Sequence, residues 1–138
     1  MLYRMLKEIN NLLQGNVVLV GSWATYLRNE TADIPTEKDI DIIVVDESIL
    51  SDLNTLGTLK FNEYPDVYAS KRYYIRQPRP TRLLIDIFIV DEFPDYTIID
   101  SIKVITKKAQ HDYYNLVLPN ITEEYMVAKF TDKKIQHA

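Results

Sequence analysis

The stretch Asp39-Ile40-Asp41-Ile42-Ile43-Val44-Val45 decides the fold, because an acidic pair opens a run of β-branched residues. Such a run predicts a strand. Side chains alternate along a strand, so Asp39 and Asp41 are predicted to share one face and Ile40 to lie on the other. Two carboxylates this close repel each other unless a positive group lies between them, and Mg²⁺ prefers oxygen ligands of this kind. The simpler alternative is a pair of surface aspartates at the start of a strand.

A second apolar run precedes this one and ends in a turn. Val17 to Val20 predicts a short strand, and the residues from Trp23 to Arg28 predict a helix with Ser22 as its N-cap. Gly21 lets the backbone turn sharply and lets a ligand approach closely. The start of a helix also offers free N–H groups to a phosphate. Taken alone, the Gly-Ser pair is explained as well by a plain N-cap after a strand.

A third acid lies inside the most apolar predicted strand, Arg82 to Val90. Aspartate disfavours strands and is seldom buried without a partner, so Asp86 is expected to face either solvent or a cation. By strand parity, Arg82 is predicted to lie on the same face as Asp86.

The remaining patterns predict a mixed β-sheet flanked by helices, an α/β (α+β) fold in a single domain over residues 1–138. Apolar residues from Leu2 to Leu13 recur at helical spacing, and Gly15 ends that helix. The other predicted elements are a helix over Asp46–Leu56, strands over Leu59–Phe61, Val67–Ala69, Arg72–Arg76, Ile102–Ile105 and Tyr113–Leu118, and a C-terminal helix over Thr122–Gln136.

The composition excludes several classes of protein. With 138 residues, 46% hydrophobic residues and a net charge of −4, the chain fits one globular domain and not a protein whose whole surface coats nucleic acid. The absence of cysteine excludes disulfides, thiolate metal sites and thiol nucleophiles. The three glycines are isolated in sequence and form neither a P-loop nor a dinucleotide-binding turn. No signal peptide or membrane-spanning run is recognised, which predicts a cytoplasmic protein without a membrane partner.

Three motifs, taken in order, resemble the nucleotidyltransferase superfamily, which has the DNA polymerase β-like fold. They are Val20-Gly21-Ser22, Asp39-Ile40-Asp41-Ile42 and Ile85-Asp86-Ile87. The resemblance covers roughly Leu2 to Val90 and includes the leading helix. It implies a minimal nucleotidyltransferase domain.

This resemblance implies an enzyme that moves a nucleoside monophosphate from a nucleoside triphosphate to an acceptor hydroxyl and releases pyrophosphate. It implies that Asp39, Asp41 and Asp86 are catalytic and hold two Mg²⁺ ions, for which Mn²⁺ can substitute. Gly21 and Ser22 would cradle the phosphates of the triphosphate. The acceptor stays open among RNA, protein and a small molecule.

Two basic residues are further nucleotide-binding candidates. Arg82 ends a basic stretch that begins at Lys71 and contains no acid. Lys129 stands in the predicted C-terminal helix, where it resembles a nucleotide-contacting lysine of toxin–antitoxin-type nucleotidyltransferases. The simpler explanations are an exposed hairpin kept soluble by its charges and a solvated lysine on an amphipathic helix.

Other functions remain open from the sequence. One is a catalytically weak or inactive module of the same fold that binds a nucleotide or a partner, as in a toxin–antitoxin-type pair. A homodimer or a separate small subunit would then complete the site. Another is a structural α/β protein in which the aspartates are unrelated.

Overall fold

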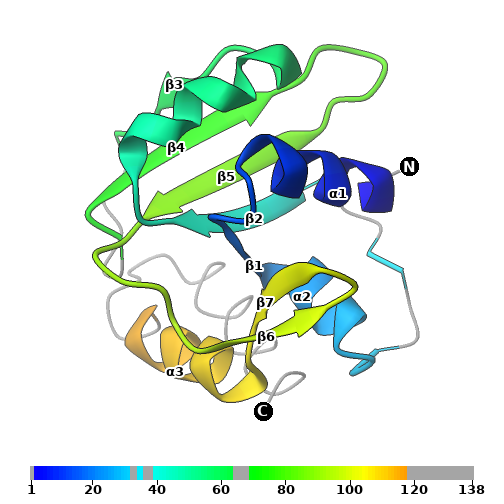
Figure 1. Cartoon of the computed structure of the whole chain (residues 1–138), viewed down its shortest axis with the longest axis vertical. Helices are drawn as coiled ribbons and strands as arrows, with labels where there is room; N and C mark the ends of the chain where they lie inside the picture. Colours follow the sequence, from blue (N-terminus) through cyan, green and yellow to red (C-terminus); the bar gives the residue numbers. More distant parts are fainter. Residues whose placement is uncertain (1, 32–33, 36–38, 64–68, 118–138) are drawn as a thin grey trace, which may run out of the picture.

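The computed structural model describes residues 2–31, 34–35, 39–63 and 69–117, and the description below is confined to them. Helices and strands of this part follow one another along the chain from blue to orange in Figure 1. In chain order they are α1 (Leu2–Leu12), β1 (Val18–Val20), α2 (Gly21–Leu27), β2 (Asp39–Val44), the 3₁₀ helix η1 (Glu47–Leu56), β3 (Lys60–Phe61), β4 (Lys71–Arg76), β5 (Leu84–Ile89), β6 (Tyr96–Ile99), β7 (Ile102–Ile105) and α3 (Lys107–Val117).

The described strands form one mixed sheet in the order β3-β4-β5-β2-β1-β7-β6. The two strands that carry the acidic motifs, β2 and β5, are parallel neighbours in its middle. β1 runs antiparallel to β2 on one side, and β4 runs antiparallel to β5 on the other. The turn after β1 and the basic strand β4 therefore flank the acidic strands.

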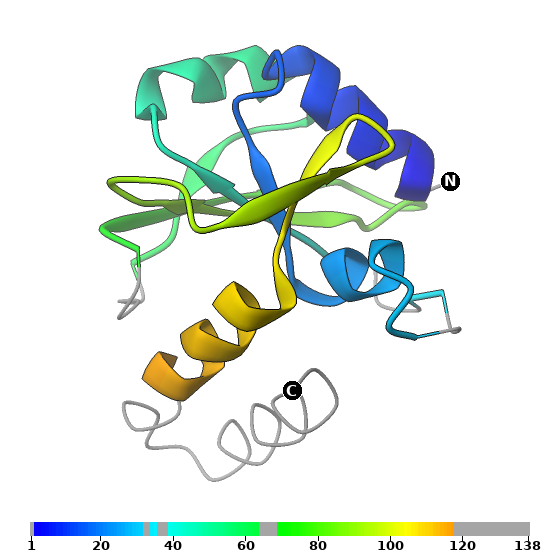
Figure 2. The same cartoon turned by 60° about the horizontal axis from the view of Figure 1, so that its bottom comes forward.

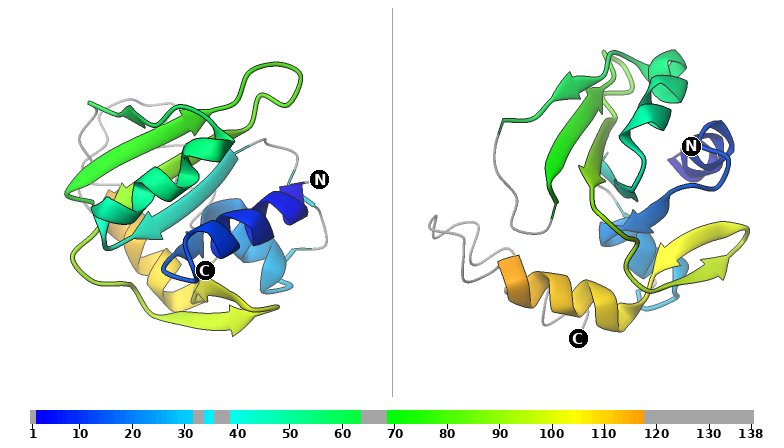
Figure 3. Two further views of the ribbon diagram at one scale, coloured as in Figure 1. Left: turned by 45° about the horizontal axis from the view of Figure 1, so that its top comes forward. Right: turned by 60° about the vertical axis from the view of Figure 1, so that its left-hand side comes forward.

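Helices cover both faces of the sheet. Figure 2 shows α1 and η1 on one face and α2 and α3 on the other. Figure 3 shows α1 and η1 side by side, and the two helices are in contact. The sheet turns its most apolar side towards this pair, because the buried residues Ile40, Ile42, Ile85 and Ile87 alternate with the acids.

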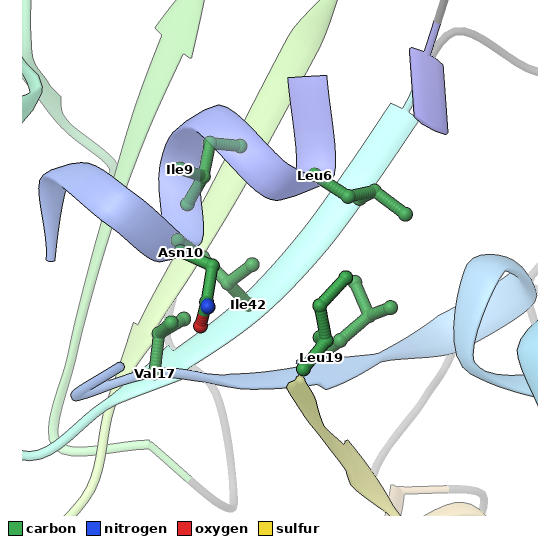
Figure 4. Close-up of a pocket in the computed structure, with 7 residues that line it drawn as sticks. Leu6, Ile9, Asn10, Val17, Leu19 and Ile42 are labelled. Atoms are coloured by element: carbon green, nitrogen blue, oxygen red, sulfur yellow. The ribbon is translucent and has the colours of Figure 1, made fainter. Parts of the chain in front are cut away.

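A small apolar pocket lies between α1 and this apolar side of the sheet (Figure 4). Asn10 is the one polar side chain on its wall, and its amide donates a hydrogen bond to the Ser101 carbonyl oxygen at 3.3 Å. Because Ile42 lines the pocket and alternates with Asp41, the pocket is separated from the acidic residues by the sheet itself. The residues that line it are Leu6, Ile9, Asn10, Val17, Leu19, Ile42 and Ile102.

The mixed sheet with flanking helices confirms the predicted fold class. The expected first helix, the two strands that carry the acids and the strand Ile102–Ile105 are all present. The helix predicted from Asp46 begins one residue later as η1, and the Asp46 carboxylate caps it by accepting a hydrogen bond from the Ser48 N–H at 3.0 Å.

The strand predicted over Tyr113–Leu118 is wrong over 113–117, the part of it that the structure describes. Residues 107–117 form the helix α3 instead. Thr106 starts this helix, because its hydroxyl accepts a hydrogen bond from the Ala109 N–H at 3.2 Å. The tyrosines favour a strand by propensity, but they continue a helix that is already capped and nucleated.

One strand was not predicted. β6 pairs antiparallel with β7, and Asp100 and Ser101 join them with φ of 53° and 68°. Two successive residues with positive φ form the turn that suits a two-residue hairpin. The turn is usually marked by glycine, and this one contains none.

The predicted C-terminal helix Thr122–Gln136, with Lys129, and most of the predicted strand Val67–Ala69 lie outside the described residues. Within the described residues, no helix has the length and apolar character needed to cross a membrane.

Candidate active site

The strand register places the three predicted acids on one face of the sheet. Asp41 of β2 lies directly beside Asp86 of β5, and Asp39 lies beside Leu84. Neighbouring strands are only about 4.8 Å apart, so side chains at paired positions on one face meet. The Asp41 and Asp86 carboxyl groups do share a hydrogen bond. The structure thus places Asp86 on the face that Asp39 and Asp41 share, and it makes Asp41 and Asp86 direct neighbours.

Asp86 sits in an environment that disfavours its charge. Burial raises the pKa of Asp86 above the ordinary value of 3.8, and the negative charge of Asp39 raises it further. The positive charges of Arg72 and Arg76 and the hydrogen bond from Asp41 act in the opposite direction, yet the net shift stays upward. A positive group bound beside Asp86 would therefore be favoured.

Gly21 brings backbone directly against the acidic pair. Its φ of +75° lies in the left-handed region, and a Cβ built on it would lie 2.5 Å from Asp41 Oδ2. A side chain at this position would require the Asp41 carboxylate to shift. The turn after β1 therefore places the first peptide groups of α2 alongside Asp41.

The start of α2 differs from the prediction. The helix begins at Gly21, its N-cap is Val20, and no side chain caps it, so the assignment of Ser22 as N-cap is wrong. The reason is the left-handed glycine, which turns the chain into the helix one residue earlier. Ser22 lies in the first turn of α2 and is partly exposed.

A buried glutamine from α3 holds this turn. Gln110 is 1% exposed, and its side-chain oxygen accepts a hydrogen bond from the Gly21 N–H at 3.1 Å. Its amide nitrogen donates to the hydroxyl of Thr25 at 3.1 Å, and that hydroxyl donates to the Gly21 carbonyl oxygen at 3.4 Å. No pattern in the sequence singles out Gln110, because the tyrosines that follow it favour a strand. The Thr106 cap was the signal that could have revealed the helix that carries it.

Arginines of β4 approach the acids from the other side. Arg72 pairs with Phe88 and Arg76 with Leu84, so both share the face of Asp86, where Tyr74 is its direct neighbour. The Arg72 guanidinium also lies over the Phe88 ring, 4.9 Å from its centroid. In the sequence both arginines belong to the basic stretch that predicts an exposed hairpin, and neither stands out there as a site residue.

Arg82 does not occupy the position that parity predicted. β5 begins only at Leu84, and Arg82 precedes it in a loop with φ of +51°. Its N–H donates to the Pro78 carbonyl oxygen at 3.2 Å. Strand parity therefore does not apply to Arg82. The basic residues that share the face of Asp86 are Arg72 and Arg76 instead.

The donor set suits a hard cation. Among the described residues, no three acidic or histidine side chains converge closely enough to form a complete metal site. Mg²⁺ does not require one, because it usually binds through one or two carboxylates together with water and substrate phosphates. The contacting carboxyl groups of Asp41 and Asp86 fit that requirement, with Asp39 as an additional oxygen donor on the same face.

Comparisons with known proteins agree with this fold. No protein-family model matches the chain, and no curated protein matches it. JHP933 from Helicobacter pylori superimposes with a TM-score of 0.51 at 17% identity, covering 87% of this chain and 56% of that chain. A structure described as "putative nucleotidyltransferase from H. pylori" superimposes with a TM-score of 0.52 at 17% identity, covering 81% and 56%.

The chain therefore spans 56% of the length of each of these two structures. At 17% identity the likeness shows a shared fold. The resemblance to nucleotidyltransferases that the three sequence motifs indicated is confirmed at the level of the fold.

Proposed function

We propose that this chain is a Mg²⁺-dependent nucleotidyltransferase that transfers a nucleoside monophosphate from a nucleoside triphosphate to an acceptor hydroxyl. The observation that carries the proposal is the contact between Asp41 and Asp86, with the Gly21 turn packed against Asp41. A strand–turn–helix beside paired carboxylates offers a place for a triphosphate and its cation. The related fold of a structure described as a nucleotidyltransferase supports the same proposal.

The reaction is an in-line displacement at the α-phosphorus. The acceptor oxygen forms a bond to that phosphorus, the bond to the bridging oxygen of the β-phosphate breaks, and pyrophosphate leaves. Asp86 is proposed to accept the proton of the acceptor hydroxyl, because its raised pKa brings it closer to the range of a general base. Asp39 and Asp41 are proposed to hold the cation with Asp86.

Bound Mg²⁺ would supply neutralisation of phosphate charge. The chain's own residues position the substrate. The Ser22 hydroxyl and the backbone after Gly21 are proposed to contact the terminal phosphates, since the close packing of Gly21 against Asp41 brings the start of α2 beside the acid that is proposed to hold the cation. Arg72 and Arg76 are proposed to supply positive charge on the face of the sheet that carries Asp86, where the phosphates would lie beside the acids.

The test is transfer by the purified chain in the presence of labelled nucleoside triphosphates, Mg²⁺ and cell extract as the source of acceptor. Asp41→Asn is expected to abolish labelling without loss of folding, since the amide can still form a hydrogen bond with Asp86. Asp52→Asn is the matched control, because Asp52 lies exposed on η1, on the opposite side of the sheet. Undiminished labelling by Asp41→Asn would refute the mechanism.

A second candidate is a nucleotide-binding module of the same fold without catalysis. What favours it is that the likeness to the two neighbouring structures, at 17% identity, shows the fold and not the chemistry. Calorimetry separates the two proposals. Metal-dependent binding of triphosphate with no labelled product from any acceptor would favour the module, and labelled product would favour the enzyme.

A further inference from the structure

We infer that Gln110 of α3 is a positioning residue of the candidate active site, holding the Gly21 turn in register with the acidic pair. This inference rests on the proposed function for its consequence on nucleotide binding. The claim that Gln110 holds the Gly21 turn rests only on the hydrogen bonds of Gln110. No sequence motif of the acidic site includes this residue, which lies 89 positions from Gly21 along the chain.

The hydrogen bonds form a closed ring. Gly21 N–H donates to Gln110, Gln110 donates to Thr25, and Thr25 donates back to the Gly21 carbonyl oxygen. Gln110 and Thr25 are the only polar side chains among the fully buried described residues, at 1% and 2% exposure. A buried polar group keeps its geometry when every partner is in place, because each broken bond leaves an unsatisfied group away from water.

The ring of hydrogen bonds holds Gly21, whose backbone is already constrained. Gly21 already carries a left-handed φ, and its Cα faces the Asp41 carboxylate closely enough that a Cβ would reach 2.5 Å from Oδ2. A rotation of the Gly21 peptide would either strike Asp41 or draw the turn away from it. Gln110 therefore sets the spacing between the turn that is proposed to receive phosphates and the acid that is proposed to hold the cation.

The ring of hydrogen bonds also decides whether the backbone N–H of Gly21 can bind a phosphate. The Gly21 N–H is already bonded inside the protein, so it is not available to a phosphate. The proposed phosphate contact therefore falls on the residues after Gly21, whose position depends on the orientation of the Gly21 peptide.

The experiment replaces Gln110 with a side chain of similar size that lacks both hydrogen-bonding groups. Gln110→Met is expected to weaken Mg²⁺-dependent binding of nucleoside triphosphates by about 10–100-fold, the loss typical when a residue that orients metal ligands is removed. Each of the four common triphosphates is titrated by calorimetry. Thr25→Val breaks the ring while keeping the Gln110–Gly21 bond, and a smaller loss is expected from it.

A second measurement does not depend on nucleotide. The Gly21 amide hydrogen is expected to exchange slowly with solvent in the wild-type chain and markedly faster in Gln110→Met. Gln77→Met is the matched control, because Gln77 also donates a side-chain hydrogen bond, to the Leu56 carbonyl oxygen at 3.0 Å, but on the η1 side of the sheet. The control is expected to leave both Gly21 exchange and triphosphate binding unchanged.

The outcomes distinguish a failure of the proposed function from a failure of the positioning role of Gln110. If the wild-type chain binds no triphosphate but Gln110→Met still speeds Gly21 exchange, the proposed function fails and the positioning role stands. If Gly21 exchange is the same in both proteins, the inference is overturned. If triphosphate binds equally well to the wild-type chain and to Gln110→Met, Gln110 has no positioning role, even though it forms these hydrogen bonds. Should Gln110→Met not fold, Gln110→Asn carries the same two measurements, because its side chain is one methylene group shorter and its amide oxygen no longer reaches the Gly21 N–H in the same geometry.

Discussion

Gly21→Ala is the perturbation that probes the contact between the turn and the acidic pair most sharply. Two separate costs are expected. A non-glycine residue in the left-handed region costs about 1–2 kcal/mol. The new Cβ would also lie 2.5 Å from Asp41 Oδ2, and forcing a side chain into a filled space costs about 1–3 kcal/mol. Together they predict a loss of roughly 2–5 kcal/mol in the free energy of unfolding.

The chain offers a matched control for the first cost. Gly15 has a φ of +78°, close to the +75° of Gly21, but a Cβ there would meet nothing within 4 Å. Gly15→Ala is therefore expected to lose only about 1–2 kcal/mol. The difference between the two variants, measured by urea unfolding at equilibrium, isolates the collision with Asp41.

A double-mutant cycle assigns that difference to the carboxylate. In an Asp41→Ala background the nearest Asp41 atom left to the new Cβ is the Asp41 Cβ, at 3.4 Å, which is ordinary contact. Gly21→Ala should then cost no more than Gly15→Ala, giving a coupling energy of about 1–3 kcal/mol. Equal losses for Gly21→Ala and Gly15→Ala in the wild-type background would refute the reasoning, because the turn would not lie against Asp41.

Three further predictions concern charge and hydrogen bonding. Asp86→Asn is expected to be more stable than wild type at neutral pH in urea unfolding, because burial raises the pKa of Asp86 and its charged form opposes folding. Arg72→Gln is expected to raise the pKa of Asp86 further, and by more than Arg76→Gln, in a carbon NMR titration. Tyr73→Phe is expected to lose about 1 kcal/mol of stability, since its hydroxyl donates to Glu47 and holds the pKa of that carboxylate below 4.5.

The sign for Asp86→Asn follows from linkage. The native state binds its proton more tightly than the unfolded chain, so wild-type stability falls as pH rises from the ordinary pKa of 3.8 through the higher native value. The advantage of the variant should be present above the native pKa and vanish below 3.8. A stability difference between Asp86→Asn and wild type that did not change with pH would contradict this reasoning. So would a pKa of Asp86 that stays the same in Arg72→Gln. An unchanged free energy of unfolding in Tyr73→Phe would contradict the role of the Tyr73 hydroxyl.

The acidic face was predictable because strand alternation is a local rule. Parity places Asp39 and Asp41 on one face of their strand without knowledge of the partner strand, but it does not relate that face to the side chain of Asp86 on another strand. What parity does not give is the register between strands. The pairing of Asp41 with Asp86 depends on how β2 and β5 dock in the assembled sheet.

The errors arose where a local preference competes with a cap or a turn. Tyr113 and its neighbours favour a strand by propensity, but the Thr106 cap starts a helix that runs through them. Arg82 was assigned by extending strand parity beyond the point where the strand begins. The Thr106 cap points to the helix that carries Gln110, but the hydrogen bond of Gln110 to Gly21 spans 89 positions and has no local sequence signal.

The central claim is that the Gly21 turn and the acidic pair together bind a cation and a triphosphate. The most direct measurement is paramagnetic broadening of amide NMR signals by Mn²⁺ in the presence of nucleoside triphosphate, since Mn²⁺ takes the same oxygen ligands as Mg²⁺. The account predicts that the signals of Gly21, Asp41 and Asp86 broaden first, while those of Gly57 and Leu13 stay sharp. Broadening that is centred elsewhere, or is unchanged in Asp41→Asn, would contradict it.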